Sequence, residues 1–162
     1  MKSALILFLV VLESSIFIVD SKFFMSSFEA NWYRAFQSCA ASGKRLVSVE
    51  SQQKHDALVD YIKTTSRYVN FSRFWLGAND MAEEGTFVWV HSGRTVTYTR
   101  WHSDEPNNTG GVENCVELVY DTVGKYIWKW NDTECKDNKR YFVCEDDFIE
   151  DDSDDEIKEF KK

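Results

Sequence analysis

The chain has 162 residues, of which 43% are hydrophobic and 15% are aromatic, which is enough for a packed core and excludes wholesale disorder. This length fits one domain. The net charge of −8 argues against nucleic acid or an anionic membrane as a partner. Ten acids and three lysines between Glu145 and Lys162 account for −7 of that charge, so residues 146–162 form an acidic tail that we expect to be disordered.

Residues 1–21 are typical of a secretory signal peptide. Lys2 precedes an apolar run, residues 4–12, that is shorter than the roughly 20 residues a membrane span needs. Val19 and Ser21 suit the −3 and −1 positions of a cleavage site. We therefore expect a secreted, extracellular protein without membrane insertion, and a retained anchor is the alternative.

Four cysteines follow the signal segment, and no two of them are close enough in sequence to suggest zinc ligation: Cys39, Cys115, Cys135 and Cys144. An even number in an oxidising compartment predicts two disulfides. Of the three possible connectivities we favour the nested one, Cys39–Cys144 with Cys115–Cys135. The long bridge would tie the first helix to the last strand.

Two helices are expected in the first part of the secreted chain. Asn31 and Ser51 suit N-cap positions, and Gly43 suits the left-handed position after the first helix. A short strand, residues 46–49, separates the helices. The side chains expected on the buried faces are Trp32, Ala35, Phe36 and Cys39 in the first helix and Ala57, Leu58, Tyr61 and Ile62 in the second.

From residue 74 onward the pattern is typical of strands and turns. The strand-like runs are residues 74–78, 86–90, 115–120, 126–130 and 141–144, and Ser92-Gly93 suits a turn after the second run. A polar stretch, residues 97–115, contains Pro106, the only proline of the chain. Long ordered loops of this kind are usually functional.

Oxygen-bearing side chains gather in and after this polar stretch: Glu105, Asn107, Glu113, Asn131 and Asp132. Carboxylates and amides without thiolate or imidazole suit Ca²⁺, which accepts six to eight oxygen ligands. Acidic loops are also common on surfaces that bind no ion, so the spacing alone leaves both interpretations open.

Seven short motifs then occur along the chain: Asn31-Trp32-x-x-Ala35-x-x-x-Cys39, Leu46-Val47-Ser48, Phe74-Trp75-Leu76-Gly77, Glu105-Pro106-Asn107, Glu113-Asn114-Cys115, Trp130-Asn131-Asp132-x-x-Cys135 and Phe142-Val143-Cys144. In this order they are highly specific, and residues 22–145 resemble a C-type lectin-like domain of the short form found in secreted single-domain insect C-type lectins. The resemblance implies an α+β fold in which two helices flank twisted antiparallel sheets. It also implies the nested disulfides and a long calcium-binding loop.

The resemblance further implies a principal Ca²⁺ site formed by Glu105, Asn107, Glu113, Asn131 and Asp132. In the family, Glu-Pro-Asn with a cis proline goes with mannose-type sugars (mannose, fucose, N-acetylglucosamine), and Gln-Pro-Asp goes with galactose-type sugars. A carboxylate only accepts hydrogen bonds whereas an amide nitrogen donates them, so this order sets the direction of the bonds to two sugar hydroxyls. The implied sugar contacts are Glu105, Asn107, Glu113 and Asn131.

A second Ca²⁺ site, away from the sugar, would use Asp80, Glu84, Asn108, Glu113 and Asn114. Asn108 and Asn114 stand where the best-equipped relatives have carboxylates, and fewer charges predict weaker binding.

Three Asn-x-Ser/Thr sequons begin at Asn70, Asn107 and Asn131. A glycan on Asn107 or Asn131 would crowd the calcium ion, so we expect these two to stay unmodified and Asn70 to be the candidate for glycosylation.

The sequence therefore predicts a secreted, calcium-dependent lectin for mannose-type glycans on glycoproteins or cell surfaces. The alternative is a protein-binding module of the same fold without sugar recognition. No enzyme is expected, because the three histidines lie in unrelated contexts and no nucleophile or metalloprotease motif occurs. Useful avidity from weak single sites would require a homodimer or a densely glycosylated target.

Overall fold

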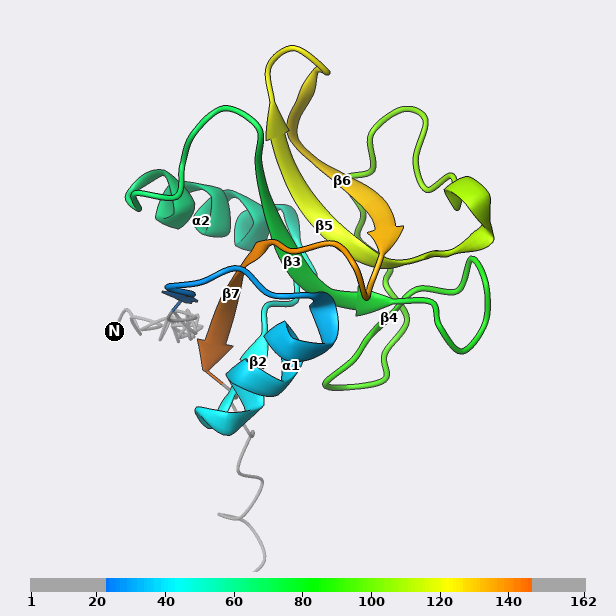
Figure 1. Cartoon of the computed structure of the whole chain (residues 1–162), viewed down its shortest axis with the longest axis horizontal. Helices are drawn as coiled ribbons and strands as arrows, with labels where there is room; N and C mark the ends of the chain where they lie inside the picture. The colour runs from blue at the N-terminus through cyan, green and yellow to red at the C-terminus, as the bar shows by residue number, and fades with distance from the viewer. Residues whose placement is uncertain (1–22, 147–162) are drawn as a thin grey trace, which may run out of the picture.

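The computed structural model describes residues 23–146, so the expected signal peptide and all but the first residue of the acidic tail lie outside the described residues (Figure 1). The helices are α1 (Trp32–Ala41) and α2 (Gln52–Lys63), with a 3-10 turn η1 (Thr109–Gly111) in the long loop. The strands are β1 (Phe23–Met25), β2 (Lys44–Leu46), β3 (Ser72–Asn79), β4 (Val88–Trp89), β5 (Glu113–Asp121), β6 (Tyr126–Glu134) and β7 (Tyr141–Asp146).

The strands form one seven-stranded sheet in the order β1-β7-β3-β5-β6, with β2 on β7 and β4 on β3. Every pairing is antiparallel except that of β3 with β7, which is parallel. The expected α+β arrangement is therefore confirmed, with the correction that the sheet is mixed. The two helices lie toward the left of Figure 1, whereas the long loop between β4 and β5 lies to the right.

Both helices begin where the sequence predicts. The Asn31 side chain accepts a hydrogen bond from the Arg34 backbone N–H at 3.0 Å, and the Ser51 hydroxyl accepts one from Lys54 N–H at 3.1 Å. Gly43 has φ of +65°, the left-handed conformation expected after α1.

Four details of the elements differ from expectation. Strand β1 was not predicted, and β4 keeps only Val88–Trp89 of the expected run. Residues 47–49 are not a strand; β2 lies just before them, because its three residues pair with β7. Ala57 is exposed, and Val59 and His55 are buried on α2 instead, because the sheet covers a helix face rotated from the expected one.

The core has two parts, and both disulfides lie in the smaller one. Cys39–Cys144 and Cys115–Cys135 are the bridges formed, which confirms the nested pairing. They pack with Trp32, Trp75 and Phe142, all 2% exposed or less. Beside them, Gly77 lies so near β2 that a Cβ atom would approach the Leu46 carbonyl oxygen to 2.7 Å, so only glycine fits there.

No helix within residues 23–146 is both long and apolar enough to cross a membrane.

Candidate calcium and sugar site

The long loop is fixed to β6 by a buried tryptophan. Trp130 is fully buried. Its backbone N–H donates to the Arg100 carbonyl at 2.8 Å, and its backbone carbonyl accepts from the His102 N–H at 3.0 Å. The Trp130 ring meets the rings of Trp89, Tyr98 and Trp101 edge to face. The segment that leads to Glu105 is therefore held against the strand that carries Asn131 and Asp132.

Glu105 lies before a cis peptide bond to Pro106, as the resemblance implies. Its Oε1 accepts a hydrogen bond from the Tyr126 hydroxyl at 2.8 Å, whereas its Oε2 is buried and has no partner among the described residues. The pKa of Glu105 is raised to about 7. Burial is the main cause and the nearby Asp132 and Glu113 contribute, against the opposing effect of the Tyr126 bond. A buried, unpartnered carboxylate oxygen beside further acids is a place where a cation would be stabilised.

Asp132 comes from β6, is 1% exposed, and meets the backbone of the loop. Its two carboxylate oxygens accept from Asn107 N–H at 3.0 Å and from Asn108 N–H at 2.8 Å. Glu113 reaches the same turn, where its Oε2 accepts from Thr109 N–H at 2.7 Å. Burial is also the main cause that raises the pKa of Glu113, and the charge of Asp132 adds to it. Three expected ligands thus meet around one turn of the loop.

Asn131 is oriented by two acceptors. Its Nδ2 donates to Glu117 Oε1 at 3.1 Å and to the Asp132 carbonyl at 2.7 Å, which uses both N–H bonds of the amide. The Oδ1 atom remains for an ion. Donation from Asn131 to a sugar hydroxyl, the other expected role, would require one of these two bonds to break. The amide of Asn107 differs, because its Oδ1 accepts from the Thr109 hydroxyl.

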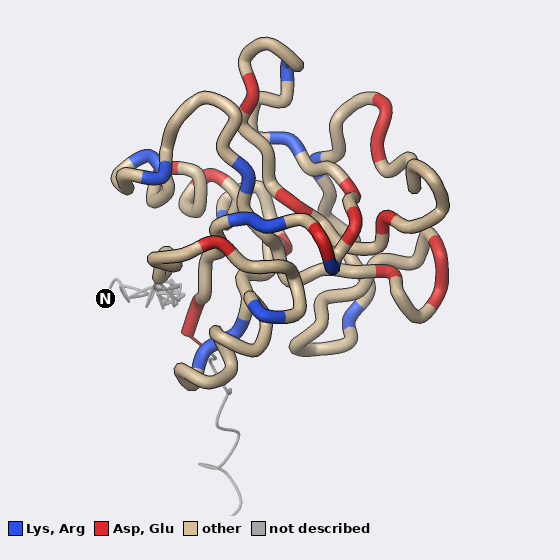
Figure 2. Tube along the Cα trace, viewed as in Figure 1, with Lys and Arg blue, Asp and Glu red and all other residues tan. Residues whose placement is uncertain are grey.

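The donor set suits Ca²⁺, because it consists of three carboxylates and two amides, which come from the long loop and from strands β5 and β6. Within residues 23–146, no three acidic, histidine or cysteine side chains are close enough to hold a metal by themselves. An ion here would therefore need the Asn107 and Asn131 amide oxygens as well. Figure 2 shows acidic segments along the loops on the right of the view.

The second expected site is brought together in part. Asp80 N–H donates to the Asn114 carbonyl at 3.1 Å, which places these two segments side by side. Asp80 Oδ2 accepts from Gly85 N–H at 2.8 Å, and its Oδ1 is buried without a partner among the described residues. Burial raises the pKa of Asp80, and the charge of Glu84 adds to it. Asn108 Oδ1 accepts from Glu113 N–H instead, at 3.0 Å.

Asn70 lies on an exposed turn, where its Oδ1 accepts from the Thr122 N–H at 3.0 Å and from the Thr122 hydroxyl at 3.1 Å. By contrast, a glycan on Asn131 would replace an N–H that donates to Glu117 or Asp132. Glycosylation of Asn70 stays a prediction.

Two residues of the site were not found from the sequence. Tyr126 supports Glu105 across 21 residues, and its ring stacks on His102 with centroids 3.9 Å apart. Burial and the bond to Glu105 raise the pKa of Tyr126 to about 12. Glu117 orients Asn131 and is fully buried. Spacing gives no signal for Tyr126, but an acid inside the apolar run 115–120 is a signal that Glu117 has charged partners.

The fold and the oxygen-rich loop define a class of binding domain, and the model of the lectin C-type domain matches residues 28–146. The chain therefore belongs to the C-type lectin family, which confirms the resemblance found in the sequence. Members of this family are binding proteins and not enzymes, as the sequence predicted.

Individual relatives agree with this assignment. The C-type lectin mosGCTL-7 of Aedes aegypti is 46% identical over 125 residues, covering 77% of this chain and 83% of the relative. The carbohydrate-recognition domain of the mouse scavenger receptor C-type lectin has the same fold, with a TM-score of 0.67, 24% identity and coverage of 79% of this chain and 91% of that one. The corresponding domain of cow CD23, solved in the presence of a GlcNAc2Man3 oligosaccharide, gives a TM-score of 0.62 at 28% identity, covering 76% and 84%.

Proposed function

We propose that this protein is an extracellular lectin that binds mannose-type glycans through Ca²⁺ held by Glu105, Asn107, Glu113, Asn131 and Asp132. The main support is Glu105, whose buried Oε2 has no partner among the described residues and lies near two further acids. The cow CD23 domain, solved with a mannose-containing oligosaccharide, adds support from a relative.

The ion would supply two coordination positions for a pair of neighbouring sugar hydroxyls. The protein would set the direction of the hydrogen bonds around that pair. Glu105 and Glu113 can only accept, and the Asn107 amide nitrogen can donate. This order suits the equatorial 3- and 4-hydroxyls of mannose, glucose or N-acetylglucosamine. Tyr126 holds Glu105 through its hydroxyl.

Secretion is part of the proposal and is supported by the signal-like residues 1–21 and by two disulfides, which form in oxidising compartments. Glycoproteins or cell surfaces that carry mannose-type sugars are the proposed partners. A homodimer of the lectin would raise avidity by about 10²–10⁴ without any new sugar contact.

The deciding experiment is chromatography on immobilised mannose. The secreted protein should be retained with millimolar Ca²⁺ and eluted by EDTA, and galactose should compete poorly. Retention that survives EDTA would contradict the calcium mechanism. Absence of retention on mannose and on galactose, with a folded protein, would favour the protein-binding module instead.

The sugar preference is tested by the double exchange Glu105→Gln with Asn107→Asp. It reverses donor and acceptor at the two positions and keeps two oxygen ligands, so preference should move toward galactose. The matched control is Glu84→Gln with Asn114→Asp, which changes the same residue types in the second candidate site. Unchanged competition by mannose and galactose in the first variant would show that this pair does not select the sugar.

A further inference from the structure

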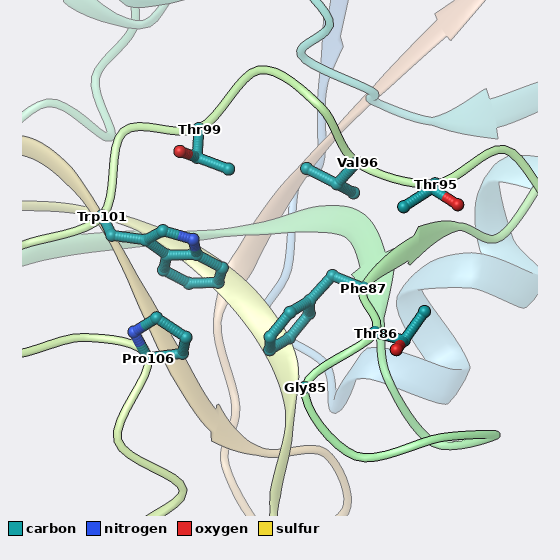
Figure 3. Close-up of a pocket in the computed structure, with 8 residues that line it drawn as sticks. All are labelled: Gly85, Thr86, Phe87, Thr95, Val96, Thr99, Trp101 and Pro106. Carbon is teal, nitrogen blue, oxygen red and sulfur yellow. The ribbon is translucent and has the colours of Figure 1, made fainter.

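A half-open pocket of about 260 Å³ borders the candidate site on the side of Pro106. We call it the aromatic pocket and define it by Gly85, Phe87, Val96, Thr99, Trp101 and Pro106 (Figure 3). Pro106 stands between two expected sugar contacts, Glu105 and Asn107. On the opposite wall, Gly85 donates its N–H to Asp80 of the second candidate site. The pocket therefore reaches both acidic segments and meets the proposed sugar site at Pro106, whose two chain neighbours are expected sugar contacts.

The walls of the aromatic pocket are mostly apolar, although three threonines, Thr86, Thr95 and Thr99, also line it. The rings of Phe87 and Trp101 have centroids 4.9 Å apart and are tilted by 56°. In Figure 3 the Pro106 ring lies beside Trp101, and Val96 faces these rings from the other side. Thr99 turns its methyl group toward Val96 and its hydroxyl group away. A ligand group here would meet ring faces and methyl groups, which favour an apolar occupant over a polar one.

The size of the pocket limits the occupant. Pockets for drug-sized ligands usually measure about 300–1,000 Å³, and this one lies just below that range. One ring or a short alkyl chain fits this volume. The walls are also held in place, because Trp101 packs edge to face on the fully buried Trp130. The subsite would therefore exist before the ligand arrives.

We propose that the aromatic pocket is a subsite for an apolar group, an aromatic ring or a short alkyl chain, that is attached to the sugar bound at Glu105 and Asn107. This inference rests on the proposed function, because the sugar brings the apolar group to Pro106. The two groups are then bound together, and the second adds affinity at little further entropic cost.

The test compares methyl α-mannoside with p-nitrophenyl α-mannoside by titration calorimetry in millimolar Ca²⁺. The aryl glycoside should bind about tenfold more tightly, which corresponds to about 1.4 kcal/mol. Val96→Phe should fill the pocket and remove this gain while leaving the methyl mannoside affinity unchanged. The matched control is Thr97→Phe, at the neighbouring exposed position that does not line the pocket, and it should keep the gain.

A second variant, Thr99→Tyr, serves if Val96→Phe lowers the melting temperature, because Thr99 is exposed at the pocket wall. Equal binding of the two glycosides would overturn the subsite, and so would a gain that survives both filling variants. If neither glycoside binds, the proposed function fails and the subsite falls with it, so the two failures are distinguishable.

Discussion

On the two sides of the central strand β3, the molecule can be compared as two halves, each with one disulfide and one buried glutamate. In the framework half (β1, α1, β2, α2 and β7), Cys39–Cys144 joins α1 to β7, and Glu145 lies against Arg45 and Lys54. In the loop half (β4, the long loop, β5 and β6), Cys115–Cys135 joins β5 to the residue after β6, and Glu117 lies against Arg73 and Arg140.

The two glutamates are alike in burial and differ in what else they touch. Both are 0% exposed. Besides its cations, the Glu145 carboxylate accepts from Ser48, through the Ser48 backbone N–H at 2.9 Å and its hydroxyl at 3.0 Å, and from no other residue in the described part of the chain. Glu117 accepts from Asn131, an expected calcium ligand that lies opposite it in the β5–β6 register. The same kind of buried ion pair therefore stabilises the fold in one half and also orients the candidate site in the other.

The largest expected difference between the halves concerns the disulfides. Replacing Cys39 and Cys144 with alanine opens a loop with a sequence separation of 105 residues, whereas replacing Cys115 and Cys135 opens one of 20. Loop entropy predicts losses of unfolding free energy of about 5 and about 3 kcal/mol. Urea unfolding in EDTA would measure both. The opposite order would show that packing around the short bridge outweighs loop entropy.

The second prediction concerns Glu117→Gln and Glu145→Gln, which keep side-chain shape and remove the charge. Each substitution leaves two cations without their carboxylate and should lower the unfolding free energy by about 3 kcal/mol. This value is at the low end for a broken buried ion pair, because the cations are partly exposed. Only Glu117→Gln should weaken calcium binding, by about tenfold or more. One of the two accepting oxygens becomes an NH₂ donor among three donors, Arg73, Arg140 and Asn131, so the Asn131 amide is held less firmly.

Glu145→Gln is thus the matched control for Glu117→Gln. Calcium titration of both variants at a temperature where each is folded separates orientation of Asn131 from loss of stability. Equal calcium affinities in the two variants would contradict a role of Glu117 in orienting Asn131.

The third prediction concerns His55, a buried residue of α2 that lies near two cations of the loop half, Arg100 and Lys129. The pKa of His55 is lowered to about 4, mainly by burial and also by the charges of Arg100 and Lys129, against an opposing effect of Asp56. In the unfolded chain the imidazole of His55 takes up a proton at about pH 6.5, well above the folded pKa. The unfolding free energy therefore has its full value, with respect to His55, above pH 6.5. Its contribution, about 3 kcal/mol, is lost as the pH falls from 6.5 to 4. Unfolding of His55→Gln across this window should show a correspondingly flatter pH dependence, and an unchanged slope would refute the assignment.

The smallest expected effect is a stabilisation by Glu105→Gln in the absence of calcium. The buried Oε2 has no partner among the described residues, and Asp132 and Glu113 are near, so a neutral amide should raise the unfolding free energy by about 1 kcal/mol. In millimolar Ca²⁺ the order should reverse, because the wild-type carboxylate binds the ion. Melting temperatures with EDTA and with Ca²⁺ measure both signs. A destabilised calcium-free variant would show that the Tyr126 bond outweighs the unpaired charge.

Sequence alone predicted most of what depends on neighbouring residues. Asn31 and Ser51 cap their helices because a cap needs only a backbone N–H three residues away. The strands β3, β5, β6 and β7 were found because continuous apolar runs mark buried strands. The predicted bounds of β2 and β4 were wrong, because a few backbone pairs with neighbouring strands, and not the local composition, decide where these short strands begin and end.

The amino-acid sequence by itself determined the two disulfide-forming pairs, the candidate oxygen ligands and the Glu105-Pro106-Asn107 order, which resembles that of C-type lectins. Only the tertiary structure decided which groups support them. Tyr126 meets Glu105 because the long loop is held against β6, and Glu117 meets Asn131 because the register of β5 and β6 places them opposite each other. Such contacts leave no periodic trace in the chain, since each depends on how two segments pack and not on their spacing.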